Sequence, residues 1–275
     1  MTIRQLIIIS RPRFWVYLVG PYVIALAAAG TWPTATLLLF GLYLTLPANV
    51  LIYGINDIYD RETDRLNVKK QGYEAVLADK NVRSIAWLIV ATNLPFLLYF
   101  GLSLPLVANF WLLVFIITGV GYSLPPLRAK ARPIIDSLFN ILYVAPAFAV
   151  YVAASGQLPS TVAVIAATLW CMAMHAYSAV PDIAADTASH TKTIATYLHR
   201  RPTLWLCGLA YAVAAILSLS LIGWPAIIGG VVYLVLIALS LQTKNNKQLF
   251  RLYTWFPVVN TVLGAGLFFV VLLHS

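Results

Sequence analysis

The chain has 275 residues, of which 61% are hydrophobic and only 10% are charged, and its mean hydropathy is +0.85. Soluble domains carry about 25% charged residues, so this composition excludes an ordinary soluble enzyme or binding module. The net charge of +9 would suit a nucleic acid, but every Lys and Arg lies outside the apolar stretches, before the first or between two of them. We therefore expect a lipid bilayer and no nucleic acid as partner.

Apolar stretches long enough to cross a membrane as helices recur along the chain. Because backbone polar groups in lipid must be satisfied within a segment, and the alternation of a membrane barrel is absent, the predicted fold is an all-α polytopic membrane protein. We expect its nine transmembrane helices to form a single bundle around a central cavity, within one domain over residues 1–275. The predicted spans are 14–30, 34–55, 84–101, 105–121, 135–154, 161–180, 203–222, 224–242 and 252–272.

The loops between the predicted spans alternate in charge. All 18 Lys and Arg residues lie before span 1 or in the loops after spans 2, 4, 6 and 8, and the opposite loops carry none. The positive-inside rule places the N-terminus and these basic loops in the cytoplasm. An odd number of spans then puts Ser275 on the opposite side of a cytoplasmic membrane.

The two long basic loops, 56–83 and 182–202, each begin with acidic residues directly after an apolar span. The layout is therefore a quasi-repeat of four-helix units, with acids after the second and the sixth span and a final helix. Repeats that build a site at their interface are common in membrane proteins.

The first acidic loop begins with NDIYDRETDRLNVKK, residues 56–70. On a helix, the spacing of Asp57, Asp60 and Asp64 puts the three carboxylates on one face, within about 60° of each other. Asn56 flanks them. Like charges at this spacing repel, so a cation is expected among them. Oxygen ligands in this number favour a hard divalent ion, Mg²⁺ first.

The second acidic loop carries Asp182 and Asp186, four residues apart and so also on one helical face, after Pro181, where a helix could restart or kink. Two such carboxylate sets across a bundle can hold two or three Mg²⁺ ions, which share their coordination with substrate phosphates. The implied ligand is a diphosphate whose apolar tail runs between the helices. Nearby bases could take its remaining charge: Arg61, Lys69, Lys70, Arg128, Lys130 and Lys192.

These motifs resemble those of the UbiA superfamily of intramembrane prenyltransferases. Asn56 to Asp64 is similar to its NDxxDxxxD signature, and Asp182 to Asp186 is similar to its DxxxD signature. The likeness covers essentially the whole chain. Within the superfamily, three stretches look like the lycopene elongases, which prenylate carotenoids. They are SRPRFWVYLVGP (10–21), NDIYDRETDRLNVKKQGYEA (56–75) and YSLPPLRAK (122–130).

The resemblance implies a role for each matching residue. Tyr122 and the bases after it match the loop that closes over the diphosphate in the family. Many members have Lys where this chain has Pro126, and many have Gly where it has His190, so the active base and the local backbone stay open. The residues that would carry Mg²⁺ and diphosphate are Asn56, Asp57, Asp60, Asp64, Asp182 and Asp186, with Arg61, Arg128, Lys130 and Lys192 at the diphosphate.

Departure of the diphosphate would leave an allylic cation, which aromatic walls could stabilise. Candidates are Tyr53, Phe139, Tyr143 and Tyr177, although packing or interface anchoring explains each of them as well.

Polar residues within or at the ends of spans are also candidates. Asp136 and Asn140, one turn apart at the start of span 5, could orient the acceptor or take its final proton. Alternatively, Asp136 is a first-turn acid favoured by the helix dipole. His175, within span 6, is expected to make a helix–helix hydrogen bond or to have a function.

The leading hypothesis is a Mg²⁺-dependent prenyltransferase that uses an isoprenyl diphosphate donor and a lipophilic acceptor. The resemblance favours dimethylallyl transfer to lycopene in C50 carotenoid biosynthesis, and the alternative acceptor is an aromatic precursor of a quinone. A cation-coupled transporter is disfavoured because the acids lie at span ends, all on one side and interleaved with bases. An alcohol phosphatidyltransferase is disfavoured because Arg61, not Gly, follows Asp60.

Overall fold

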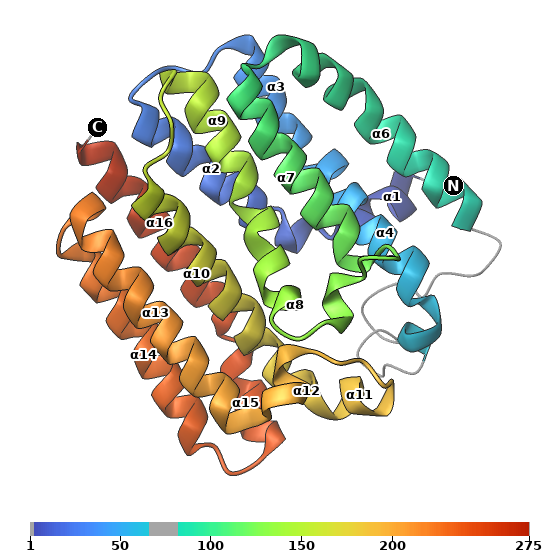
Figure 1. The fold of residues 1–275 in the computed structure, drawn as a ribbon, viewed down its shortest axis with the longest axis vertical. Coiled ribbons are helices and arrows are strands. Elements are labelled where there is room, and N and C mark those ends of the chain that lie inside the picture. Colours follow the sequence, from blue (N-terminus) through green and yellow to red (C-terminus); the bar gives the residue numbers. More distant parts are fainter. Residues whose placement is uncertain (1–2, 66–81, 275) are drawn as a thin grey trace. The chain divides into compact units, whose positions relative to one another are not determined.

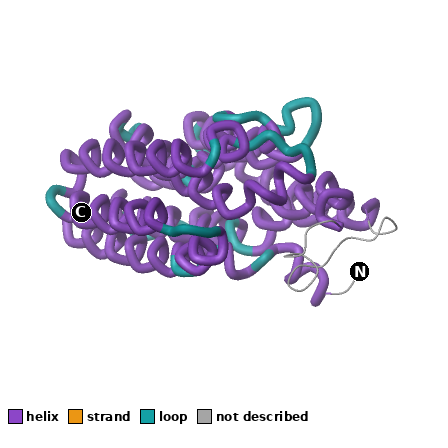
Figure 2. Tube along the Cα trace, turned by 90° about the horizontal axis from the view of Figure 1, so that it is seen from below, coloured by secondary structure: helices purple, strands orange, loops and turns teal. Residues whose placement is uncertain are grey.

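A computed structural model of the protein describes residues 3–65 and 82–274, and the side chains of Ile3, residues 61–65 and His274 are not among those described. The described chain consists of helices joined by short loops, without a β-strand, which confirms the predicted all-α fold (Figure 2). The helices form two compact units, 1–128 with 145–157 and 129–144 with 158–275. Each unit carries one of the two acidic clusters, as the quasi-repeat predicts. Whether residues 1–275 act as one domain stays a prediction.

The described helices of the first unit include both halves of the bent pair described below, three complete apolar spans and the second part of a fourth (Figure 1). Its elements are α1 (Ile3–Ser10), η1 (Pro12–Phe14), α2 (Val16–Ala29), α3 (Ala35–Tyr43), α4 (Leu46–Arg65), α6 (Val82–Ser103), α7 (Leu106–Ser123) and α9 (Ala145–Ser155).

In the second unit, α10, α13, α14 and α16 run side by side (Figure 1). Its elements are η3 (Ala129–Ala131), α8 (Ile135–Leu138), η4 (Phe139–Tyr143), α10 (Thr161–Ala179), η5 (Val180–Asp182), α11 (Ile183–Ala188), α12 (Ile194–Leu198), α13 (Arg200–Ile222), α14 (Pro225–Gln242), α15 (Asn246–Tyr253) and α16 (Phe256–His274).

Eight described helical segments are long and apolar enough to cross a membrane, and the number rises to nine if a bent pair at the N-terminus counts as one. That pair, Arg4–Phe14 and Val16–Ala29, bends by 60°. The bend follows from Arg11, whose left-handed backbone (φ 47°) interrupts the helix, and from Pro12, which cannot donate a helical hydrogen bond. The predicted span 14–30 therefore corresponds to α2 alone.

Span 2 is interrupted between α3 and α4. Pro47, in the first turn of α4, lacks the N–H that would continue the ladder. In the same turn, the side-chain amide of Asn49 donates to the carbonyl oxygens of Leu44 and Thr45, at 2.9 and 2.6 Å. These bonds satisfy carbonyls that lipid could not, so the chain continues into the helix that carries the first acidic cluster.

Span 5 is also broken, and the two units divide within it. The 3₁₀ turn η4 ends before Ala145, and Pro146 removes a helical donor in the next turn. Before the break, α8 and η4 pack on α10, whereas α9 packs on α2 and α7. The chain passes from one unit to the other after residue 128, between spans 4 and 5 as the quasi-repeat predicts, and it does so again inside span 5 and after residue 157.

A chain of buried hydrogen bonds fixes three helices of the second unit. The indole N–H of Trp170 on α10 donates to the hydroxyl of Tyr233 on α14 at 2.9 Å, and that hydroxyl donates to Asn260 on α16 at 2.9 Å. Tyr233 also stacks on Tyr211 of α13, with ring centroids 4.2 Å apart. Polar links of this kind hold helices together where lipid removes the hydrophobic drive for association.

Candidate active site

The first acidic cluster lies on α4, as the spacing predicts. Asp57 and Asp60 are three positions apart on this helix, and as whole residues they are only 8% and 9% exposed. Asp64 also lies on α4, but its side chain, like that of Arg61, is outside the described residues, as are Lys69 and Lys70 altogether. Two buried carboxylates one turn apart need compensating positive charge.

Arg11 supplies part of that charge. Its Nη2 donates to Oδ1 of Asp57 at 2.7 Å, and its guanidinium carbon lies 4.6 Å from the ring centroid of Tyr53, one turn earlier on α4. The left-handed conformation at Arg11 is part of the backbone turn from which this side chain reaches α4. From the sequence, Arg11 counts among the bases before span 1 and lies in the stretch SRPRFWVYLVGP, but it was not expected in the site. The SRPR segment, a turn with two bases before an apolar span, is the signal that could have indicated it.

The end of α7 approaches the same cluster. The amide of Asn56 donates to the hydroxyl of Ser123 at 3.2 Å, next to the half-buried Tyr122. The predicted closing loop therefore begins beside the first residue of the NDxxDxxxD signature. Arg128, at the end of that loop, is exposed and has a left-handed backbone (φ 38°).

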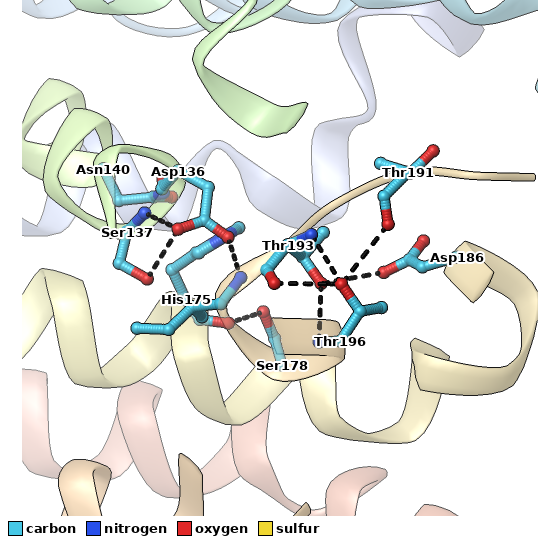
Figure 3. Close-up of polar contacts among 10 residues, drawn as sticks. Asp136, Ser137, Asn140, His175, Ser178, Asp186, Thr191, Thr193 and Thr196 are labelled. Carbon is cyan, nitrogen blue, oxygen red and sulfur yellow. Dashed lines mark hydrogen bonds and ion pairs between the residues drawn. The ribbon is translucent and has the colours of Figure 1, made fainter. Parts of the chain in front are cut away.

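The second acidic cluster lies where α10 gives way to α11. Pro181 is in the short 3₁₀ turn η5, so the helix restarts here as predicted. Asp182 and Asp186 are both half-buried. The carbonyl oxygen of Asp186 accepts from the N–H of Thr191 at 2.8 Å, and its carboxylate accepts from the hydroxyl of Thr193 at 3.4 Å (Figure 3).

His190 lies in the turn between α11 and α12. Its φ of 54° is the left-handed conformation that Gly adopts readily and most other residues disfavour. The backbone at this position therefore keeps a Gly-like conformation, although the side chain has changed.

Lys130 is the base that the structure associates with the second cluster. It lies on η3, outside the predicted spans, and is 9% exposed. Burial lowers the pKa of Lys130 to about 8, although the nearby carboxylate of Asp186 raises it. Lys192, the other predicted base in this unit, is exposed. The sequence left the choice among the bases open, and burial beside Asp186 distinguishes Lys130.

Of the four aromatic candidates, Tyr53 and Tyr177 are buried, whereas Phe139 and Tyr143 are half-buried. Tyr53 is 8% exposed and its ring lies 5.7 Å from that of Phe14. Tyr177 is 1% exposed, contacts Phe256 edge-on at 4.7 Å, and shares a hydrogen bond of 3.0 Å with the hydroxyl of Ser240. These contacts account for Tyr177 as a packing residue between α10, α14 and α16.

Asp136 and Asn140 form part of a buried polar group with His175. The amide of Asn140 donates to the backbone carbonyl of Asp136 at 2.7 Å. Oδ2 of Asp136 lies 3.6 Å from Nε2 of His175 on α10 (Figure 3). This approach joins α8 to α10, but at 3.6 Å it is longer than the helix–helix hydrogen bond that was one of the two expected roles of His175.

The donor chemistry of the first cluster fits Mg²⁺. Asp57 and Asp60 bring hard carboxylate oxygens within one turn of α4, beside the amide of Asn56. Within the described ranges, no group of three or more His, Cys, Asp or Glu side chains is close enough to hold a metal ion. Mg²⁺, however, typically takes only one or two carboxylates and completes its shell with water and substrate phosphates.

The apolar helices define a polytopic helical membrane protein, and acidic residues lie at the end of one of these helices in each unit. The model of the UbiA prenyltransferase family matches residues 14–272. The chain is 38% identical to the lycopene elongase/hydratase of Haloferax volcanii, over 94% of this chain and 85% of that protein. It is 37% identical to the lycopene elongase/hydratase of Halobacterium salinarum, over 95% and 94%.

The fold also matches a solved structure, a UbiA homolog from Archaeoglobus fulgidus bound to GPP and Mg²⁺, with a TM-score of 0.72, 19% identity and coverage of 98% of this chain and 99% of that one. At this identity the likeness concerns the fold. The assignment to a family rests on the match to the family model and on the relatives above 30% identity. The chain belongs to the UbiA prenyltransferase family, and it is an integral membrane prenyltransferase.

Proposed function

We propose that this prenyltransferase transfers a dimethylallyl group from its diphosphate to lycopene or a related carotenoid, and that the reaction depends on Mg²⁺. The assignment of a carotenoid as acceptor is supported by the likeness to two lycopene elongase/hydratases, at 38% and 37% identity over 94% and 95% of this chain. Family membership supports an allylic diphosphate as donor.

The residues that would hold Mg²⁺ and the diphosphate are those of the two clusters: Asn56, Asp57, Asp60, Asp64, Asp182 and Asp186. When bound, Mg²⁺ would neutralise the charge that builds on the departing diphosphate. Both clusters serve the same reaction in this proposal, because each has carboxylates at the end of an apolar helix and a base close by. Those bases are Arg11 in the first unit and Lys130 in the second.

The chain's own side chains would do the remaining work. Lys130 holds a buried ammonium beside Asp186, and this charge would pair with the diphosphate as its C–O bond breaks. The allylic carbon then forms a C–C bond with an electron-rich double bond of the acceptor, which afterwards loses a proton or gains water. Apolar helices around the reacting carbons keep bulk water from capturing the cation first.

We also propose an orientation of the protein in the membrane. Since all Lys and Arg lie on one side of the predicted spans, we place the N-terminus and both acidic clusters in the cytoplasm and the C-terminus on the opposite side. A cysteine introduced at Gln157 and one at Lys244 should then react with a membrane-impermeant thiol reagent from opposite sides of the membrane. Labelling from the same side would contradict this orientation.

The test of function is expression in a bacterial host that accumulates lycopene, followed by mass spectrometry of the pigments. The proposal predicts carotenoids heavier than lycopene by one or two five-carbon units, with or without added water. Unchanged lycopene, together with a prenylated aromatic acid in the membranes, would instead assign the enzyme to quinone biosynthesis. A host that carries the empty vector gives the baseline pigments.

A further inference from the structure

The carboxylate of Asp136 connects the start of α8 to the turn that follows the second acidic cluster. Its Oδ1 accepts from the backbone N–H of Ser137 at 2.7 Å. Its Oδ2 accepts from the backbone N–H of Ile194 at 2.6 Å, across 58 residues of sequence. The side chain is 0% exposed, so both oxygens are enclosed by protein and each serves a backbone donor. Buried carboxylates are retained where their acceptors are used in this way.

From Ile194 the hydrogen bonds continue to the second acidic cluster. Thr193 and Thr196 form a capping box at the start of α12, with bonds of 2.8 and 3.2 Å. The hydroxyl of Thr193 donates to the carboxylate of Asp186 at 3.4 Å, and the N–H of Thr191 donates to the carbonyl of Asp186 at 2.8 Å. Figure 3 shows this path from Asp136 to Asp186 within one unit.

Two further contacts fix Asp136 itself. His175, on the long helix α10, places Nε2 3.6 Å from Oδ2 of Asp136. The backbone N–H of Asp136 donates to the carbonyl of Arg132 at 2.9 Å, two residues after the buried Lys130. Asp136 therefore lies between α10, which it approaches through His175, and the segment that follows Asp186 of the DxxxD signature, to which it is hydrogen-bonded through Ile194.

We propose that Asp136 is a positioning residue for the second acidic cluster. Through the N–H of Ile194 it fixes the turn between α11 and α12, and through Thr193 that turn holds the carboxylate of Asp186 in the geometry that binds Mg²⁺ and diphosphate. This role rests on the proposed function. It differs from direct contact with the acceptor, because both oxygens of Asp136 are already enclosed and bonded.

The test compares Asp136→Asn with the control Ser178→Ala, which removes a hydroxyl that donates to the carbonyl of His175 within α10 at 2.7 Å. Asn keeps the size of Asp but turns one acceptor oxygen into a donor, so one of the two backbone donors loses its partner. Two quantities are measured on protein in nanodiscs. They are deuterium uptake of peptides covering 187–198 and the Kd for inorganic diphosphate with Mg²⁺.

If Asp136 positions the second acidic cluster, Asp136→Asn should take up deuterium faster over residues 187–198. Its Kd for diphosphate should rise about 10- to 100-fold, the range found when groups that orient metal ligands are removed. The Kd of the control Ser178→Ala should stay within about twofold of the wild-type value, since this substitution leaves the hydrogen bonds of Asp136 intact. Unchanged uptake with an unchanged Kd overturns the proposal. An unchanged Kd with a lower turnover also overturns it, because Asp136 would then act on the acceptor.

If Asp136→Asn does not fold, substitutions of Thr193 provide an independent test of the proposal. Thr193→Val removes the hydroxyl link to Asp186 and should weaken the Kd in the same direction, whereas Thr193→Ser keeps the hydroxyl and should restore it. A wild-type Kd in Thr193→Val overturns the proposal. If the wild-type protein itself does not bind diphosphate with Mg²⁺, the proposed function fails, and deuterium uptake alone decides whether Asp136 holds the turn.

Discussion

Arg11 and Asp57 form a charged hydrogen bond of 2.7 Å that joins the N-terminal bend to the first acid of the NDxxDxxxD signature. The two side chains are 13% and 10% exposed, so the pair is largely removed from solvent. The same guanidinium covers the ring of Tyr53 at 4.6 Å. The bend between α1 and α2 is thus part of the environment of the first acidic cluster, and four predictions follow from this and the other contacts of the two clusters.

The first prediction concerns the buried pair itself. Arg11→Gln leaves the carboxylate of Asp57 without its closest cation, and breaking a largely buried pair on one side costs about 3 kcal/mol. Thermal unfolding in detergent should show this loss. The exposed neighbour Arg13 provides the control, since Arg13→Gln should change stability by less than about 0.5 kcal/mol.

A double-mutant cycle decides whether the effect of Arg11 comes through Asp57. Arg11→Gln combined with Asp57→Asn removes both charges, so its loss of stability should be clearly smaller than the sum of the two single losses. Strict additivity would show that the two side chains do not interact in the folded protein.

Second, neutralising either acidic cluster should abolish turnover. Asp57→Asn and Asp182→Asn each remove a carboxylate proposed to hold Mg²⁺, and the expected loss of rate is on the order of 10²–10³-fold or more. Both proteins should remain folded in membranes, as seen by size-exclusion chromatography after extraction. Activity near the wild-type level in both variants would refute the assignment of the metal and diphosphate residues.

Third, Lys130 should matter more for the reaction than for stability. Lys130→Met removes an ammonium whose pKa burial has lowered to about 8, so the folded protein loses a group that is costly to bury. We expect an unchanged or higher melting temperature, a raised KM for the allylic diphosphate and a rate lower by on the order of 10²-fold. Lys244→Met, in the exposed turn before α15, is the control and should leave both the rate and KM unchanged.

Fourth, His190→Gly should stabilise the protein. His190 has a φ of 54°, and a left-handed residue other than Gly costs about 1 kcal/mol, part of which the greater freedom of Gly in the unfolded chain offsets. Thermal unfolding should therefore show a small rise in melting temperature. His190→Val, with a β-branched side chain at the same φ, should lower it. A drop in stability on His190→Gly would mean that contacts of the imidazole outweigh the backbone cost.

Much of the fold follows from local patterns in the sequence. Hydropathy predicts where membrane helices lie, and a spacing of three and four residues puts acids on one helical face, so α4 with Asp57 and Asp60 could be foreseen. The restart of the helix after Pro181 is also local. Each of these properties depends on residues within one or two turns of each other.

What the sequence did not reveal depends on contacts between distant residues. Arg11 reaches Asp57 across 46 residues because of a left-handed turn, and the acceptor of the N–H of Ile194 lies 58 residues away at Asp136. No periodicity links such positions. The break of span 5 carried a signal in Pro146, but the division of that span between two units depends on which helices its halves contact.

The most direct test of the proposed function uses purified protein in lipid, with lycopene and isotopically labelled dimethylallyl diphosphate, in the presence of Mg²⁺ or of a chelator. Mg²⁺-dependent dimethylallyl transfer to lycopene predicts labelled carotenoids heavier than lycopene by one or two five-carbon units with Mg²⁺, and none with the chelator. Label that never enters the carotenoid fraction, although the same preparation prenylates an aromatic acid, would contradict it.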